Sequence, residues 1–195
     1  MTSLIFFGDF YPTQQHKDAA KNSHLFCKIM STVLKNVDYS FVNLEGPIFS
    51  CDIDVDPILK YASNLSQDVD CLNILKSLNK PVLCMANNHI MDYGSLGLRA
   101  TQNTLLEHSI ETVGLGSLKD ANPFKPYIIK HNNNKLAIFN VAEGEEGRDF
   151  FFQEQGPCIE SHSELFASIC RYAQTGYFPI VICHAGAEHI PQPPP

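Results

Sequence analysis

Four short apolar segments of this sequence are each followed by side chains that could bind a metal ion. Asp9 follows the first segment, Glu45 the second, the Asn87–His89 cluster the third, and His184 the last. Carboxylate, amide and imidazole groups in one site suit divalent ions such as Mn, Fe or Zn. If the segments are parallel strands, their carboxyl ends meet at one edge of a sheet, where α/β proteins bind ligands. The sequence therefore predicts a divalent-metal site built from four strand ends.

Each of these residues also has a structural explanation. An aspartate after a strand, such as Asp9, is often a helix cap, and Glu45 before Gly-Pro could be a solvated turn residue. The amides of Asn87 and Asn88 follow a buried strand and need hydrogen-bond partners there. His184 is either a ligand or a hydrogen-bonded core histidine. The residues expected at the rim of the site are Glu188 and His189.

Two acidic segments contain further carboxylates. Residues 52–56 alternate aspartate with other residues, like the start of a calcium-binding loop. Pro57 and Ser63 stand where an EF-hand needs glycine and glutamate, so we reject that site and expect an acidic loop or exposed strand face. Glu143 begins the second segment, which either faces the same cleft as the metal site or is a solvated turn.

The segments before the candidate ligands have the length and composition of buried strands. We predict strands over residues 4–7, 39–44, 81–85 and 180–183, because each is a short apolar run bounded by polar or turn-forming residues. Residues 127–130 and 136–139 flank the polar segment 131–134 and predict a β-hairpin. Strands that alternate with helices indicate an α/β fold with a largely parallel sheet, to which the hairpin is attached.

Helices are expected to cover this sheet. Their apolar stripes are Leu25, Ile29 and Val33; Cys71, Leu75 and Leu78; Leu98, Thr101 and Leu105; and Leu165, Ile169 and Tyr172. Ser66 is placed to cap the second helix. A capping box over Ser161–Glu164 begins the last helix, and Gly176 ends it.

Composition favours one soluble domain in a reducing compartment. The chain has 195 residues, of which 44% are hydrophobic and 18% charged, enough for a sizeable core. A net charge of −7 argues against nucleic acid as the main partner. The sequence has no apolar run near the roughly 18 residues of a membrane span and no basic signal-peptide region. Seven cysteines without a CxxC pair favour free thiols, so we expect a cytoplasmic protein.

The strand-end motifs resemble those of the capsule-synthesis CapA family, which is linked to poly-γ-glutamate and belongs to the calcineurin-like metallophosphoesterase superfamily. The motifs are Gly8-Asp9, Asn43-Leu44-Glu45-Gly46-Pro47, Ala86-Asn87-Asn88-His89 with Asp92-Tyr93-Gly94, Gly114-Leu115-Gly116, and His184 with Gly186 and Glu188. They occur in the family's order over the whole chain. The sequence is therefore identified as a member of this family.

The resemblance implies a four-layer α/β sandwich whose strand ends hold two divalent metal ions. By motif, Asp9 would bind the first ion, Glu45 would bridge both, and Asn88 and His184 would bind the second. His89 would be the general acid or contact the phosphate. The implied reaction is hydrolysis of a phosphoester by a metal-activated water. The residues that would contact the substrate or support the ligands are Asn43, Asn87, Asp92, Glu143, Glu188 and His189.

Two features depart from the superfamily pattern. Tyr11 stands where other members have a histidine, as expected of the CapA branch. The family also continues to a Gly-His-x-His element that supplies further imidazole ligands, whereas this sequence stops at Pro195. We therefore expect residues 1–195 to form a single domain that is incomplete at its C-terminal end and holds one or two ions. Exposed apolar surface should make it self-associate.

Two classes of function are open at this point. The first is a metal-dependent phosphoesterase of capsule or surface-polymer biosynthesis, acting on a small phosphorylated metabolite or a polymer precursor. The second is a non-catalytic binding or assembly module that keeps the fold with an incomplete metal site. The missing C-terminal element favours the second for this chain. His89 favours the first for the complete protein, because a binding module has little need of a general acid.

Overall fold

The computed structural model describes residues 2–22, 25–60, 63–117, 119–143, 155–159 and 163–186. Within these residues, no helix has both the length and the apolar character needed to cross a membrane.

A four-stranded parallel sheet contains three of the predicted strands. Its strands, in order, are β1 (Leu4–Phe10), β2 (Tyr39–Leu44), β3 (Pro81–Cys84) and β4 (Glu111–Val113). The central strands β2 and β3 are buried on both faces, as parallel strands under helices usually are. Among the described strands, β1 pairs with β2 alone, and its Phe6 is 46% exposed. The prediction of a buried first strand is therefore wrong: it is an edge strand.

The predicted hairpin and the last predicted strand form a second sheet. Its strands are β6 (Tyr127–His131), β7 (Asn134–Ala142) and β9 (Phe178–His184), with β7 in the middle. Asn132 and Asn133 both have positive φ and make the two-residue turn of the β6–β7 hairpin. The hairpin is confirmed, but it is not attached to the parallel sheet, because β7 pairs with β9 instead. Two short strands, β5 (Leu115–Gly116) and β8 (Gly156–Pro157), pair separately.

The helices lie between the strands, largely as predicted. They are α1 (Gln14–Lys21), α2 (Lys28–Asn36), the 3-10 turn η1 (Val69–Cys71), α3 (Leu72–Leu75), α4 (Gly94–Glu107) and α6 (Ser163–Gln174). The predicted stripe Leu98, Thr101 and Leu105 of α4 is buried. Residues 161 and 162 of the predicted capping box lie outside the described residues.

The stripe predicted for the first helix does not face the core. Ile29 is 79% exposed and Val33 is 45% exposed, whereas Leu34 is fully buried. Leu25 lies before α2, which begins at Lys28. The helix is rotated so that Leu34, outside the stripe, packs inward.

The cap predicted for the second helix is also corrected. Asp68, and not Ser66, begins the helical turn, because its carboxylate accepts a hydrogen bond from the backbone N–H of Asp70. Cys71 and Leu75 are buried as the stripe requires.

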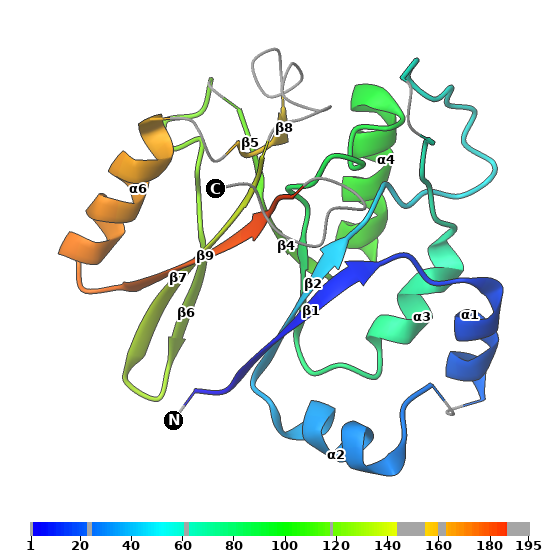
Figure 1. Ribbon diagram of the computed structural model, residues 1–195, viewed down its shortest axis with the longest axis horizontal. Helices are drawn as coiled ribbons and strands as arrows, with labels where there is room; N and C mark the ends of the chain where they lie inside the picture. The colour runs from blue at the N-terminus through cyan, green and yellow to red at the C-terminus, as the bar shows by residue number, and fades with distance from the viewer. Residues whose placement is uncertain are drawn as a thin grey trace.

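Side chains of β2 and β3 point alternately into two cores. Val42 and Leu83 pack with residues of α3 and α4, whereas Phe41 and Val82 pack against Ile138 and its neighbours in the second sheet. A third core holds β7 against α6. Figure 1 shows the two sheets side by side, with α6 beyond the second sheet and α3 and α4 beside the parallel sheet. The carboxyl ends of β1, β2, β3 and β9 are thereby brought to one region.

Candidate metal centre

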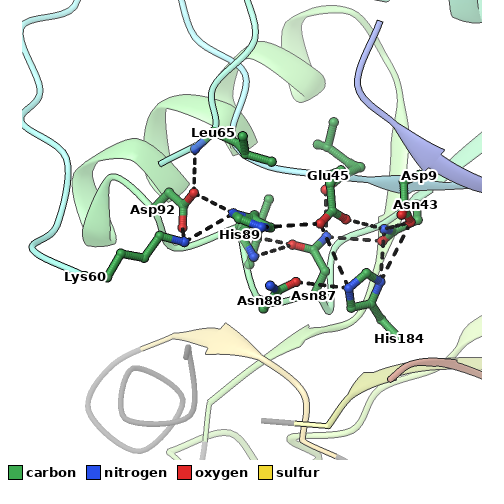
Figure 2. Close-up of polar contacts among 12 residues, drawn as sticks. Asp9, Asn43, Glu45, Lys60, Leu65, Asn87, Asn88, His89, Asp92 and His184 are labelled. Carbon is green, nitrogen blue, oxygen red and sulfur yellow. Dashed lines mark hydrogen bonds and ion pairs between the residues drawn. The ribbon is translucent and has the colours of Figure 1, made fainter. Parts of the chain in front are cut away.

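Three predicted ligands from three strand ends lie within reach of a single ion. One ligand atom each of Asp9, Glu45 and His184 can be chosen so that all three lie within 4.8 Å of one another. Asp9 lies in β1, Glu45 directly follows β2, and His184 ends β9, so both sheets contribute. Figure 2 shows the three side chains turned toward one another. Two carboxylates and an imidazole form a mixed oxygen and nitrogen donor set that suits divalent transition metals.

An irregularity in β1 accompanies the position of Asp9. Phe6 pairs with Phe41 and Asp9 pairs with Asn43, so β1 has one residue more than β2 over this stretch. Such a bulge redirects side chains and is common beside functional sites. The side chain of Asp9 is 61% exposed, which leaves the ligand cluster open to solvent on the β1 side.

Asn43 lies at the centre of the three ligands. Its Nδ2 lies 2.8 Å from Oδ1 of Asp9, 2.6 Å from Oε2 of Glu45 and 3.2 Å from Nδ1 of His184. An amide nitrogen carries two hydrogens, so it cannot satisfy three acceptors at once. At least one ligand atom therefore keeps a lone pair for another partner, which a cation could use.

Asn88 lies against the imidazole of His184. Its Oδ1 is 3.0 Å from Nε2 of His184, while Nδ1 of the same ring faces the donor group of Asn43. These contacts assign the ring proton to Nε2, which donates to Asn88, and leave Nδ1 as the acceptor that faces Nδ2 of Asn43. The structure thus places Asn88 beside the cluster, with its amide oxygen as the fourth candidate ligand.

Asn87 holds the turn that follows β3. Its Nδ2 donates to the carbonyl of Leu44 at 2.7 Å and to Oδ1 of Asn43 at 3.2 Å. Its own Oδ1 accepts the backbone N–H groups of His89 and Ile90. The side chain is almost fully buried, and both its donors and both its lone pairs are used. Asn87 therefore positions two strand ends and has no group left for a substrate.

His89 lies between the ligand cluster and a buried carboxylate. Its Nε2 is 3.8 Å from Oε1 of Glu45, and its Nδ1 is 2.8 Å from Oδ2 of Asp92. A nitrogen without a proton would be repelled by the carboxylate, so Nδ1 carries the proton and donates it to Asp92. The ring consequently points Nε2 at the cluster.

Lys60 belongs to this network and was missed by sequence reasoning. Its Nζ lies 2.6 Å from Oδ1 of Asp92 and 3.2 Å from Nδ1 of His89, and its side chain is 8% exposed. The lysine comes from an irregular segment between β2 and η1 with no motif around it. A basic residue somewhere before the Asn-Asn-His motif is the only signal in the sequence, and it is not specific.

Glu45 is a buried acid without a full positive charge beside it. Burial raises the pKa of Glu45 above its ordinary value, and the charge of Asp9 raises it further, while His184, His89 and the hydrogen bond from Asn43 act in the opposite direction. A divalent cation at this position would favour the carboxylate form.

The other candidate residues lie outside the ligand cluster. Glu143 follows β7, and its Oε2 accepts the backbone N–H of Gly186 at 2.7 Å. Its own backbone N–H donates to the carbonyl of His184 at 3.0 Å, so Glu143 holds the chain after β9. Glu188 and His189 lie outside the described residues.

Comparison with known proteins finds capsule-synthesis proteins. A model of the family described as bacterial capsule synthesis protein PGA_cap matches residues 3–195. The chain is 29% identical over 179 residues to the PGA biosynthesis protein CapA of Bacillus subtilis (strain 168), covering 89% of this chain and 45% of that protein. It is 32% identical over 87 residues to the capsule biosynthesis protein CapA of Bacillus anthracis, covering 45% of this chain and 21% of that protein. The chain thus spans less than half the length of either relative.

Proposed function

Because this chain belongs to the bacterial capsule synthesis protein PGA_cap family, we propose that it acts as a metal-dependent phosphoesterase in capsule or poly-γ-glutamate biosynthesis. The observation that carries the proposal is the cluster of Asp9, Glu45 and His184 with His89 beside it. The proposed substrate is a small phosphorylated metabolite or a polymer precursor that carries a phosphoester.

Asp9, Glu45 and His184 would hold a divalent cation such as Mn, Fe or Zn, with the oxygen of Asn88 as a further ligand. The donor set fits a cation for two reasons. The two hydrogens of the Asn43 amide cannot satisfy Asp9, Glu45 and His184 together. Burial also leaves the carboxylate of Glu45 without a full compensating positive charge. When bound, such a cation neutralises phosphoryl charge and makes water more acidic. The described residues contain one such cluster, so we propose one ion in this part of the chain.

His89 would deliver the proton that the leaving oxygen needs. Its Nε2 faces the cluster, and its Nδ1–H donates to Asp92. To act as the acid, the ring would carry a second proton on Nε2; it would give this proton to the leaving oxygen and be left neutral, with Nδ1–H still held by Asp92. A ring held in this way has one nitrogen available to exchange a proton in a fixed direction, which is what general acid catalysis requires. Asn43 and Asn87 would keep the strand ends, and therefore the ligands and His89, at fixed separations.

We further propose that the fold is the four-layer sandwich of the calcineurin-like metallophosphoesterases. The three cores support this assignment: α3 and α4 pack on the parallel sheet, the two sheets pack on each other, and α6 packs on the second sheet. An experimental structure in which these helices and sheets do not pack on one another in this order would overturn the assignment.

Metal stoichiometry per chain tests the proposed site. After loading with Mn, Fe or Zn, the unmodified protein should retain about one ion, and His184→Ala and Glu45→Gln should lose it. His108→Ala is the control, because His108 is exposed, lies outside the ligand cluster, and has its Nδ1 against the carbonyl of Thr104 in the same helix. An unchanged stoichiometry in His184→Ala would contradict the site.

Hydrolysis of aryl phosphates tests the chemistry. The loaded protein should hydrolyse 4-nitrophenyl phosphate, and His89→Gln should lower kcat by about 10²- to 10⁴-fold, the usual contribution of a general acid. The loss should be larger for phenyl phosphate, because its poorer leaving group depends more on protonation. Bound metal without hydrolysis of any phosphoester would favour the binding module instead.

A further inference from the structure

Asp92 is a fully buried carboxylate held by groups from different parts of the chain. Its Oδ1 lies 2.6 Å from Nζ of Lys60. Its Oδ2 accepts the backbone N–H of Leu65 at 2.6 Å and the Nδ1–H of His89 at 2.8 Å. Figure 2 shows Lys60, Asp92, His89 and Glu45 following one another toward the ligand cluster.

Lys60 supplies the positive charge that this carboxylate needs. A charged carboxylate in the interior is costly unless it is both paired and hydrogen-bonded. The side chains of Lys60 and Asp92 are 8% and 0% exposed, so water contributes little to either charge. The ion pair with Lys60 therefore fixes the orientation of the Asp92 carboxylate.

The two oxygens of Asp92 have different partners. Lys60 takes Oδ1, which leaves Oδ2 directed at the imidazole of His89. The ammonium also lies 3.2 Å from Nδ1 of His89, but it is only a donor, so the proton on Nδ1 goes to Asp92. A rotation of the carboxylate would break both contacts. The direction in which Nε2 of His89 points is thus coupled to Lys60.

The segment that carries Lys60 is anchored to Asp92 without the lysine side chain. The backbone N–H of Ile58 donates to the carbonyl of Asp92 at 2.8 Å, and Leu65 donates to its carboxylate. Loss of the Lys60 ammonium therefore removes a charge from the network while these two attachments remain.

We propose that Lys60 is a positioning residue for His89 and acts through Asp92. The proposal rests on the proposed function, since it explains how the general acid is held. The contacts of Lys60 with described residues are to Asp92 and His89, which lie outside the cluster of Asp9, Glu45 and His184. Its loss should therefore disturb His89 and leave the metal site intact.

Nitrogen NMR of the zinc-loaded protein tests the orientation of His89 directly. The ring signals of His89 are assigned by their loss in His89→Gln. Lys60→Met should shift both ring nitrogens and speed the exchange of the Nδ1 proton, and Lys60→Arg should restore them. Asn64→Ala is the matched control, because it removes a hydrogen bond to the carbonyl of Ile58 and leaves the charges unchanged.

Kinetics and metal content separate this proposal from the one it rests on. We expect Lys60→Met to bind zinc like the unmodified protein and to lose about 10- to 100-fold in kcat with little change in KM. If no phosphoester is hydrolysed, the proposed function fails while the NMR result still decides the role of Lys60. Unchanged His89 signals in Lys60→Met, or an equal change in Asn64→Ala, would overturn the proposal. Lys60→Gln replaces Lys60→Met if that variant does not fold.

Discussion

The candidate ligand side chains meet around a single neutral donor, the amide of Asn43. Asp9 and Glu45 are both acids, and the Nδ2 of Asn43 contacts both of them together with His184. Without a cation, this amide provides much of the attraction that offsets repulsion between the two carboxylates, and it does so with two hydrogens for three acceptors. If the proposed metal site is correct, Asn43 links the stability of the metal-free protein to the occupancy of that site.

Replacement of Asn43 by aspartate tests this link. Asn43→Asp removes the donor and adds a third acid, so the metal-free protein should lose about 1–3 kcal/mol of stability. Zinc should restore part of this loss, because a cation compensates the added charge. Denaturant unfolding with chelator and with zinc measures both effects. Asn103→Asp on the exposed face of α4 is the control, and equal unfolding of both variants in chelator would contradict the link.

The proximity of the candidate ligands could be predicted from the sequence, because the prediction depends only on local patterns at the strand ends. Short apolar runs followed by polar residues can be recognised in the sequence, and the structure does place Asp9, Glu45, Asn88 and His184 in one region. Lys60 could not be found in the same way. Its contact with Asp92 depends on the path of an irregular segment, which no periodic pattern describes.

Among the secondary-structure elements, β7 contacts the end of β3 and thereby positions the turn that carries Asn88 and His89. The Oδ1 of Asn140 in β7 accepts the backbone N–H of Ala86 at 2.7 Å, directly before the Asn87–His89 turn. Gly114, after β4, packs against both groups with a φ of +102°. A Cβ on Gly114 would lie 2.0 Å from Oδ1 of Asn140 and 2.7 Å from the nitrogen of Ala86. Only glycine fits this junction of the two sheets.

Gly114→Ala should therefore destabilise the fold. The positive φ and the clash together should cost about 2–5 kcal/mol. Gly176→Ala is the matched control, because Gly176 also has a positive φ but nothing lies within 4 Å of the added Cβ. Denaturant midpoints of the two variants measure the difference. Equal losses would show that the contact with Asn140 does not matter.

The apolar runs of the sequence predicted where strands occur along the chain better than they predicted the position of each strand within its sheet. Tyr39–Leu44 is a strand over the predicted residues, and the hairpin lies where the asparagine-rich turn predicts it. Within the part of the chain that the structure describes, β1 and β9 are edge strands. These positions were not predicted, because an apolar run looks the same with one neighbouring strand or two. The rotation of α2 likewise depends on tertiary packing and not on the spacing of its apolar residues.

Asp38 connects the beginning of β1 with the hairpin. Its Oδ2 accepts the backbone N–H of Ser3 at 2.7 Å and the hydroxyl of Ser3 at 2.8 Å, and its Oδ1 lies 3.7 Å from Nδ1 of His131. These hydrogen bonds, the backbone one first, lower the pKa of Asp38, and the charge of His131 lowers it further. The folded state therefore favours the carboxylate more than the unfolded state does.

This difference predicts a loss of stability in acid. The contribution of Asp38 is fully present above its unfolded pKa of about 3.9 and is lost as the pH falls through the lower folded pKa. The stability difference between the unmodified protein and Asp38→Asn should thus shrink from about pH 4 downward. Denaturant midpoints over this range measure it, with Asp56→Asn in the exposed acidic segment as control. A constant difference would contradict the role of Asp38.

On the molecule as a whole, apolar side chains remain exposed on separate elements. Ile29 and Val33 lie on α2, Phe6 lies on the edge strand β1, and Phe178 and Val181 lie on the edge strand β9. Edge strands also present unpaired backbone groups to other chains. The net charge of −7 opposes association but does not cover these groups. The exposed apolar side chains and edge strands are therefore consistent with the self-association expected from the sequence.

The exposed face of α2 allows this expectation to be tested. We expect the sedimentation coefficient of the unmodified protein to rise with concentration in the micromolar range, because association would bury apolar surface. The double variant Ile29→Lys with Val33→Lys should stay monomeric, since it places two charges where a second copy would pack. Thr32→Lys, on an exposed position of the same helix, should associate like the unmodified protein. A protein that sediments as a monomer at every concentration would show that this apolar face does not drive self-association.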